Sequence, residues 1–277
     1  MNELTEKMYN AGVEHFSPSQ LNRPLANWMF EYVYLTKSQR RDITVGENAA
    51  YGTAVHGAIQ SVLCAGVDIE EATEHALMEF DFHPANESED KRVKYRDLIP
   101  AAVDLAVQEL SGWAKSEAEL RIEWHPEELA VPIIGFVDMA QGFKGRFLEM
   151  KTKAPRLGAV KKDGTRSWTK AATPKEPEWT HIQQAAVYYK ATGLLPNIGY
   201  ISDHSVVVFS PDNCEKLQLD AIEYAANDMK AKAVRRQNLL SISTDPKVLA
   251  SFLEPEFEHP FYWKHQFTAE AKDLFNL

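Results

Sequence analysis

Three charged residues interrupt a short apolar segment in the middle of the chain. Residues 135–138 and 147–151 read as two short strands joined by a glycine-bounded turn, with Asp138 expected at the end of the first strand. Glu149 and Lys151 are two positions apart, so a strand would place them on one face. Burying unpaired charge costs free energy, so stability alone would not select this set. A bound metal ion would offset that cost.

The chemistry of these side chains favours metal-dependent hydrolysis of a phosphodiester. Carboxylates such as Asp138 and Glu149 are the ligands that Mg²⁺ and Mn²⁺ prefer. A nearby ammonium, here that of Lys151, would stabilise negative charge on an attacked phosphate. The alternative is a surface cluster of ion pairs on a hairpin.

Length and composition are those of an ordinary globular protein. The chain has 277 residues, of which 44% are hydrophobic and 25% charged, and we expect one domain with a helical part over about 1–118 and a catalytic part over about 119–277. No apolar run reaches the roughly 20 residues that span a bilayer, and the N-terminus lacks a signal-peptide pattern. We therefore expect no membrane association and a cytoplasmic location, which is the host cytoplasm if a phage encodes the chain. The net charge of −10 disfavours a surface that coats nucleic acid everywhere but permits a local basic track.

Hydrophobic periodicity predicts an α/β fold, a mixed sheet flanked by helices with a helical N-terminal region. Helices are expected at 17–32, 49–63, 69–80, 90–118 (bent at Pro100), 178–192 and 211–240. Strands are expected at 120–124, 128–134, 135–140, 146–152, 198–202 and 205–209. Residues 153–177 read as a long loop, and residues 255–263 as an irregular segment that packs aromatic side chains.

The hairpin and its neighbours resemble one known family. Residues 51–56, Tyr-Gly-Thr-Ala-Val-His, are similar to the Gly-x-x-x-His element of RecB-like nucleases, and residues 184–188, Gln-Ala-Ala-Val-Tyr, to their Gln-x-x-x-Tyr element. Between them lies an Asp and Glu-x-Lys hairpin like that of the PD-(D/E)XK nuclease superfamily. The start, residues 16–21, resembles the Ser-x-Ser-x-Leu entry to the first helix. The likeness covers roughly residues 16–190 in the family's order.

This resemblance implies a fold, a chemistry and a set of site residues. Asp138, Glu149, the carbonyl of Met150 and the imidazole of His56 would hold one or two Mg²⁺ or Mn²⁺ ions, while Lys151 would orient the attacking water. Gln184 and Tyr188 would line the same site. The products would carry 5′-phosphate and 3′-hydroxyl ends. Many RecB-like relatives hold an iron–sulfur cluster on four cysteines, but this chain has only Cys64 and Cys214, so we expect no cluster.

Each of these assignments has a structural alternative. His56 lies beside an apolar helical face, where a histidine is usually a packing residue. Gln184 and Tyr188 are four residues apart on one helical face and could form a packing pair between helix and sheet. Gln183 replaces Gln184 as the site glutamine if the helical register differs by one.

The stretch from Lys151 to Lys175 is the most basic part of the chain. It holds eight cations against a single acid, Asp163: Lys151, Lys153, Arg156, Lys161, Lys162, Arg166, Lys170 and Lys175. We expect this segment to follow the phosphates of DNA, with Trp168 stacking on a base. The alternative is a solvated loop. The arginines at 235 and 236 and the basic run at 37–41 read as ordinary solvated charges near helix ends.

The function favoured by these features is that of a DNA exonuclease in phage or bacterial recombination, repair or degradation. An endonuclease on the same fold is the nearest alternative. A third possibility is a decayed nucleic-acid-binding subunit that needs a helicase or recombinase, and a single-strand-binding protein is a further candidate partner. The chain lacks a Gly-x-x-x-x-Gly-Lys-Ser/Thr loop, so any ATP-driven motor would be a separate protein. The motifs leave open the polarity of digestion, strand preference, DNA versus RNA and oligomeric state.

Overall fold

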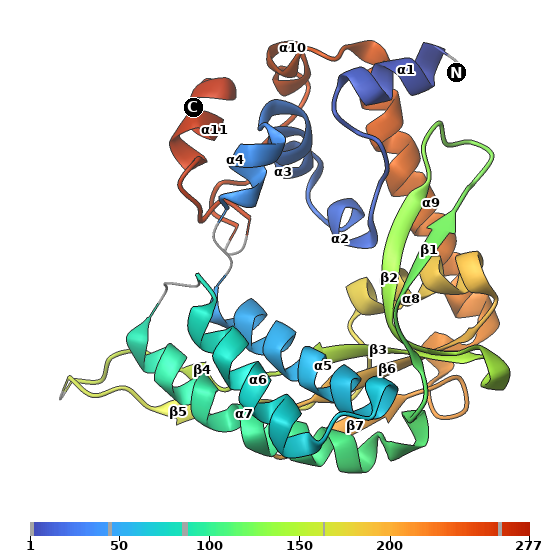
Figure 1. The fold of residues 1–277 in the computed structure, drawn as a ribbon. Helices are drawn as coiled ribbons and strands as arrows, with labels where there is room; N and C mark the ends of the chain where they lie inside the picture. The colour runs from blue at the N-terminus through green and yellow to red at the C-terminus, as the bar shows by residue number, and fades with distance from the viewer. Residues whose placement is uncertain (1–2, 44–45, 85–87, 163, 260–261) are drawn as a thin grey trace.

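A mixed five-stranded sheet with helices on both faces organises the chain (Figure 1). The computed structural model describes residues 3–43, 46–84, 88–162, 164–259 and 262–277. The sheet has the order β1-β2-β3-β6-β7, and its strands are β1 Glu117–Trp124, β2 Ile133–Gln141, β3 Arg146–Thr152, β6 Leu195–Ile201 and β7 Val206–Phe209. Strands β3 and β6 are parallel, and the other neighbours are antiparallel. The predicted class, a mixed sheet flanked by helices, is confirmed.

The helices lie before, between and after these strands. They are α1 Glu3–Asn10, α2 Pro18–Leu21, α3 Leu25–Met29, α4 Lys37–Arg41, α5 Glu47–Ala65, α6 Ile69–Phe82, α7 Glu89–Glu109, α8 Trp179–Thr192, α9 Leu219–Ile242, α10 Pro246–Ala250 and α11 Thr268–Leu274. A π-helical turn covers Phe30–Tyr34, and 3-10 turns cover Ser111–Trp113, Gly142–Lys144 and Glu215–Leu217. The predicted helices that became α5, α6 and α8 are confirmed with small shifts at their ends. In the described part of the chain, no helix combines the length and apolarity that crossing a bilayer requires.

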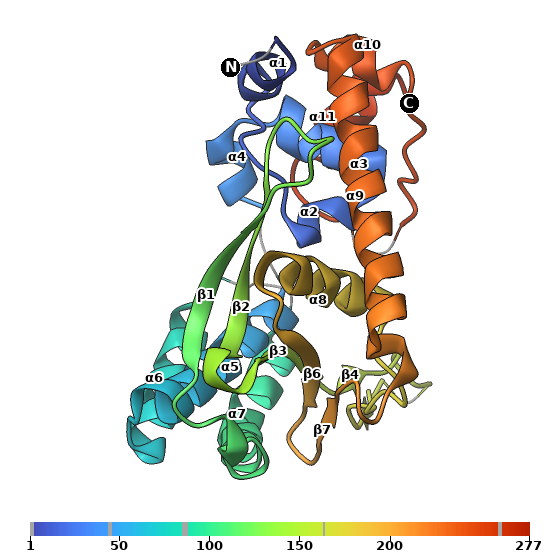
Figure 2. The ribbon, with the colours of Figure 1, turned by 90° about the vertical axis from the view of Figure 1, so that its right-hand side faces the viewer.

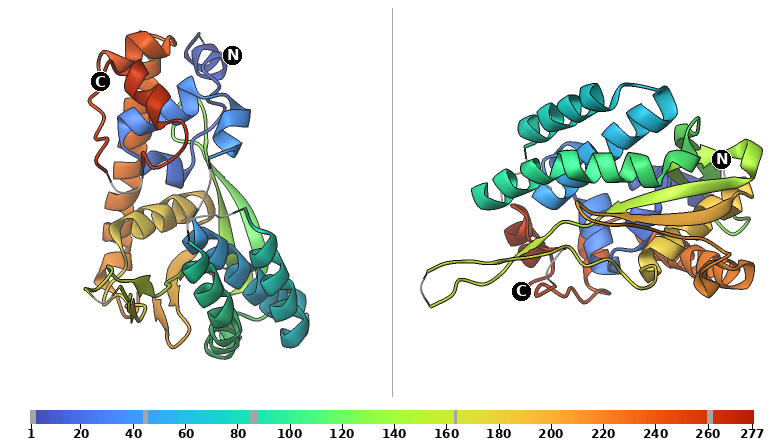
Figure 3. Two further views of the ribbon diagram at one scale, coloured as in Figure 1. Left: turned by 90° about the vertical axis from the view of Figure 1, so that its left-hand side faces the viewer. Right: turned by 90° about the horizontal axis from the view of Figure 1, so that it is seen from below.

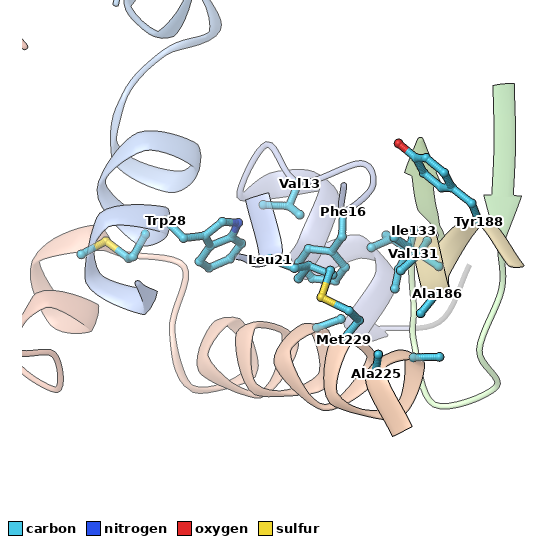
Figure 4. Close-up of a cluster of buried hydrophobic side chains, with 14 of the residues drawn as sticks. Val13, Phe16, Leu21, Trp28, Val131, Ile133, Ala186, Tyr188, Ala225 and Met229 are labelled. Atoms are coloured by element: carbon cyan, nitrogen blue, oxygen red, sulfur yellow. The ribbon is translucent and has the colours of Figure 1, made fainter. Parts of the chain in front are cut away.

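Two apolar clusters form the core, one on each face of the sheet. Successive side chains of a strand point to opposite faces, so Phe147 packs toward α8, α9 and the N-terminal segment while Leu148 packs toward α5, α6 and α7. Figure 4 shows part of the first cluster, which includes Phe16 from the N-terminal segment and Met229 on α9. Figure 2 shows how α8 and α9 cover the face opposite to α5. The sheet therefore lies in the middle layer.

The N-terminal third differs from the prediction of one helical region. Ser17 does cap a helix, since its hydroxyl accepts the Gln20 N–H at 3.3 Å and Pro18 follows at the first position. That helix ends after one turn, because Pro24 cannot donate to a continuing helix and instead precedes α3. The segments α1 to α4 pack with the C-terminal helices, while α5 to α7 build the other cluster. The described helices before residue 118 thus pack on both faces of the sheet.

Two predicted elements around the hairpin were wrong. The strand expected at 128–134 is a turn, and β2 then runs unbroken over Ile133–Gln141, so Asp138 lies inside the strand and not at its end. Prolines at 126 and 132 lack the N–H groups that a ladder needs. The helix expected to reach residue 118 ends at Glu109, because the chain reverses through Ser111–Trp113 and Lys115 adopts a left-handed φ of 64°.

Further differences lie toward the C-terminus. The loop expected at 153–177 contains a short hairpin, β4 Arg156–Leu157 with β5 Trp168–Thr169, which projects from the body (Figure 3). The helix expected from residue 211 begins at Leu219. The helices α10 and α11 were not predicted. The aromatic tail packs as expected at Trp263, which contacts Phe30 and Phe257, but Pro260 and Phe261 lie outside the described residues.

Candidate active site

The site forms where two neighbouring strands separate. Strands β2 and β3 pair over three residue pairs that end at Met139 opposite Leu148, and beyond that point the ladder stops. Asp138 and Glu149 are the next residues on the two strands. The carboxylate of Asp138 accepts the N–H of Met150 across this fork, with 2.5 Å between Oδ2 and N. The fork therefore brings the two predicted acids together and fixes one of them by a backbone bond.

A polar chain leads from Glu149 to helix α8. The Lys151 Nζ lies 2.7 Å from the Glu149 Oε1 and donates to the Gln184 Oε1 at 3.0 Å. The Gln184 Nε2 in turn donates to the hydroxyl of Tyr188 at 2.7 Å. Because residues four apart lie on one helical face, α8 presents both of its side chains to the strands. Four of the predicted site residues thus form one hydrogen-bonded series.

Helix α8 is held in this register from both sides. Gln183 is fully buried and donates to Asp228 on α9, so it turns away from the fork, and Gln184 is the glutamine that reaches Lys151. On the strand side, a Cβ at Gly135 would lie 2.5 Å from a ring carbon of Tyr188. Only glycine leaves room for that ring against β2.

Helix α5 approaches the site through another close contact. A Cβ at Gly52 would lie 2.9 Å from the Thr152 Oγ1, so glycine lets the helix lie near the end of β3. His56 follows one turn later, and its Nε2 is buried without a hydrogen-bond partner among the described residues. Burial, with a contribution from the charge of Lys151, lowers the pKa of His56 to about 4. The imidazole is therefore neutral, with a ring nitrogen free to bind a metal.

The two carboxylates of the site, when ionised, carry more negative charge than the single ammonium of Lys151 neutralises. Burial raises the pKa of Glu149 to about 8, and the charge of Asp138 adds to this shift. Burial likewise raises the pKa of Asp138 to about 6, against the opposing effects of Lys151 and the Met150 N–H. Burial lowers the pKa of Lys151, but the two carboxylates outweigh it, and the net shift is upward. An added cation would favour the ionised form of both acids.

The donor set fits a hard divalent cation. The Glu149 Oε2 is buried and, within the described ranges, has no partner, as is the case for the His56 Nε2. Carboxylate oxygens suit Mg²⁺ or Mn²⁺, and a neutral imidazole can complete such a set. In the described part of the chain, however, no group of three or more ligating side chains converges as it would around an ion. Lys151 pairs with Glu149 there, and the predicted use of the Met150 carbonyl stays a prediction.

Two residues near the fork were missed by the sequence analysis. The register of β1 and β2 places Glu119 opposite Asp138, and the Gln60 Nε2 donates to both the Glu119 Oε1 (2.8 Å) and the Asp138 carbonyl (2.9 Å). Glu119 has a φ of 52°, a strained value for a residue with a side chain. Its charge contributes to the raised pKa of Glu149. Gln60 follows His56 by four positions, and this shared helical face was the available signal.

His181 was also missed, although it lies on the site's helix. Its Nδ1 is 2.7 Å from the Tyr200 hydroxyl, which also accepts the N–H of Glu178. Burial, with the positive charge of Lys151, lowers the pKa of His181 to about 4. The spacing of three residues to Gln184 places both on one side of α8, and this spacing could have indicated it.

The predicted nucleic-acid-binding residues lie mainly on the projecting hairpin. Side chains exposed there are those of Arg156, Lys161, Lys162, Arg166 and Lys170. Lys153 lies at its base and pairs with Glu178. Trp168 is partly buried, with its ring edge against Tyr95 and 6.0 Å between the ring centroids. Contact of these residues with DNA, and stacking by Trp168, stay predictions.

The chain matches no protein-family profile and no curated protein.

Proposed function

We propose that this chain is a metal-dependent deoxyribonuclease of the PD-(D/E)XK type, similar to RecB-like nucleases, and acts as an exonuclease. One observation carries the proposal: the buried Glu149 and the half-buried Asp138, both with raised pKa values, meet at a strand fork beside Lys151. The Glu149 Oε2 and the His56 Nε2 are both buried without a partner in the described structure, and the charge of Lys151 acts on both residues. A core built only for stability would not gather these groups.

Each residue of the site has a distinct role in the proposed reaction. Asp138, Glu149, the neutral His56 and the Met150 carbonyl would hold the Mg²⁺ or Mn²⁺ ion. When bound, that ion supplies Lewis-acid chemistry, which neutralises phosphate charge and activates water. Lys151 presents its ammonium to the developing negative charge.

Helix α8 positions the lysine. Gln184 accepts from Lys151 and so limits the rotamers of its side chain, while Tyr188 holds Gln184 in place. The two helical residues therefore act through Lys151, and neither needs to contact the scissile phosphate.

The proposed setting is DNA recombination, repair or degradation in a phage or bacterium, with a recombinase, helicase or single-strand-binding protein as candidate partner. An endonuclease on the same fold is the second candidate, because the site residues are those of either activity. A decayed binding module is disfavoured by the presence of Asp138, Glu149 and Lys151 together.

Digestion of end-labelled DNA tests the proposal. Linear single- and double-stranded DNA and a covalently closed circle are incubated with Mg²⁺, with Mn²⁺ and with chelator. Metal-dependent loss of the linear DNA with the circle spared supports the exonuclease, and the released label gives its polarity. Cutting of the circle supports the endonuclease. Absence of cleavage by the isolated chain contradicts an autonomous nuclease.

Two variants then test the assigned roles. Lys151→Ala is expected to cut turnover by about 10²- to 10³-fold while DNA binding persists, because it removes charge stabilisation in the transition state. Asp138→Ala is expected to abolish both turnover and Mn²⁺ binding in a calorimetric titration. Lys144→Ala, at the far end of the same hairpin, is the matched control and should behave as wild type. Near-normal rates for Lys151→Ala would show that the site is assigned wrongly.

A further inference from the structure

A cleft of about 640 Å³ opens beside the first turn of α8. Its walls include Trp179 and Tyr224, whose ring centroids are 5.8 Å apart and whose residues are 43% and 69% exposed. The other apolar lining residues are Pro174, Pro177, Ile182 and Ala221. Large exposed aromatic side chains are costly in water, and a pair of them at a cleft is a platform for another flat ring.

A second hollow, of about 430 Å³, lies between α9 and the α2–α3 segment and is basic. Its charged lining residues are Arg23, Lys232, Arg235, Arg236 and Glu256, and His259 also lines it. Two of the cations have acidic neighbours: Arg23 lies 2.8 Å from Glu31, and Lys232 lies 3.3 Å from Asp228. In a chain with a net charge of −10, this is a local excess of positive charge.

Repulsion among these cations favours binding of an anion in the basic hollow. Burial, with a contribution from the charge of Arg235, lowers the pKa of Arg236 to about 10. Burial also lowers the pKa of Lys232, with Arg236 and Arg235 contributing. A phosphate in the hollow would relieve this repulsion.

Both hollows lie along one face of α9. On α9, Lys232 follows Tyr224 by eight residues and Arg235 follows it by eleven. Both cations therefore lie within roughly 80° of Tyr224 around the helix axis and about 12 to 17 Å from it along the axis. The side chain of Asn22 ties the basic hollow to α8, since its Nδ2 donates to the Thr180 carbonyl at 3.3 Å. Figure 2 shows α8 meeting α9 with α2 beside them. The aromatic pair and the cations thus lie along the same side of α9.

The aromatic cleft also borders the candidate active site. Glu178 lines the cleft and pairs with Lys153, which follows Lys151 by two residues just past the end of β3. A nucleic-acid strand that leaves the fork between β2 and β3 and passes Lys153 would therefore meet the aromatic cleft first and the basic hollow next.

We infer that this surface binds single-stranded nucleic acid, with Trp179 and Tyr224 stacking on a base and the cations around Lys232 and Arg235 binding phosphates. The inference rests on the proposed function and names the form of substrate held next to its site. Stacking platforms combined with basic grooves bind single strands, because an unpaired base offers its flat face to the protein. A duplex keeps its bases stacked on one another and offers only its backbone.

Binding in chelator, where no cleavage occurs, is the direct test. A fluorescent oligothymidylate and a duplex of equal length are titrated with wild type and with the double variants Trp179→Ala/Tyr224→Ala and Lys232→Ala/Arg235→Ala. The aromatic variant should weaken single-strand binding about tenfold or more and leave duplex binding nearly unchanged. The cation variant should lower the slope of log K against log salt by about 1.4 for the single strand. Phe252→Ala and Lys247→Ala are matched controls, since Phe252 is an exposed aromatic residue just after α10 and Lys247 is an exposed lysine on α10.

Two further measurements distinguish failure of this inference from failure of the proposed function. They are binding of an oligonucleotide with abasic sites and steady-state cleavage, both with the same proteins. Stacking on a base is supported if wild type binds the abasic strand more weakly than the intact strand while the aromatic variant binds the two alike. Equal single-strand binding by wild type and both double variants overturns the inference, even if Mg²⁺-dependent cleavage is present. If wild type binds the strand through this surface but never cleaves, the inference stands and the proposed nuclease activity fails. Equal loss of single-strand and duplex binding in the aromatic variant would also overturn it.

Discussion

Glu149 is 2% exposed and has one charged partner, Lys151, at 2.7 Å. Its second oxygen is buried without a partner in the described structure. Such a carboxylate is tolerated when its pKa rises or when a cation joins it. Its neighbours Asp138 and Glu119 both add to the upward shift. The residue is therefore a sensitive probe of the site in the absence of metal.

The first prediction concerns the pH dependence of stability in chelator. The pKa of Glu149 is about 8 in the folded protein against an ordinary value of 4.5, so the folded state binds the proton more tightly. The resulting stabilisation is complete below about pH 4.5 and is lost as the pH rises toward 8, by up to about 1.4 kcal/mol per pH unit. Urea unfolding between pH 5 and 8 measures this. Glu149→Gln should flatten the profile, and equal slopes for both proteins would contradict the assignment.

Glu119 supplies a second residue-scale prediction. Its strained φ of 52° and its position opposite Asp138 indicate a functional reason for a carboxylate there. Glu119→Gln is expected to weaken Mn²⁺ binding about threefold to tenfold, because it removes one negative charge near the acids. Stability should change by less than about 0.5 kcal/mol. Calorimetric titration measures the affinity, with Glu117→Gln, on the same strand, as the control that should bind normally.

At the scale of elements, glycines set the distance between the site's helices and its sheet. Gly52 brings α5 close to Thr152, and Gly135 makes room for the ring of Tyr188. Each of these close approaches places a site residue of the packed helix, His56 on α5 and Gln184 on α8.

The contact between β2 and α8 can be tested directly. Gly135→Ala would put a Cβ 2.5 Å from the ring of Tyr188, so the ring and helix must shift. We expect a loss of about 1 to 3 kcal/mol in the free energy of unfolding, together with slower metal-dependent cleavage, because Gln184 moves with the ring. Gly142→Ala, where a Cβ meets nothing within 4 Å, is the matched control. Unchanged stability in the Gly135 variant would contradict this packing.

Elements with strong periodicity were predicted well, and those set by distant contacts were not. The apolar spacing of α5 and α8 and the alternation of β3 are local signals. By contrast, β2 extends over Ile133–Gln141 because it pairs with β1 on one side and β3 on the other. The hairpin of β4 and β5 has only two residues in each strand, too few for any periodic signal.

At the scale of the whole molecule, one sheet is shared by two apolar clusters. Ile198 on β6 belongs to one cluster and Leu148 on the neighbouring β3 to the other, and both are fully buried. Since the strands pair side by side, loss of either cluster exposes the sheet to water and undermines the other. This favours the single domain predicted from the sequence.

Cooperative unfolding tests that prediction. Ile198→Ala and Leu148→Ala should each cost about 2 to 5 kcal/mol and shift the same single urea transition, seen alike by circular dichroism and by tryptophan fluorescence. Leu195→Ala, at a position that is 43% exposed, should shift it much less. A two-step transition in either core variant would show that the clusters unfold as separate units.

The sequence by itself determined several local features of this protein: the helices α5, α6 and α8, the strands that carry Asp138, Glu149 and Lys151, and the types of ligand that are available. These follow from spacing along the chain, which fixes the face of an element on which a side chain lies. Only the tertiary structure decided that Gln184 and not Gln183 meets Lys151, and that Glu119 lies opposite Asp138. It also placed the cleft lined by Trp179 and Tyr224 near the site, where Glu178 of the cleft pairs with Lys153. Such neighbours are set by strand register and by close packing between elements far apart in the chain, which no local pattern encodes.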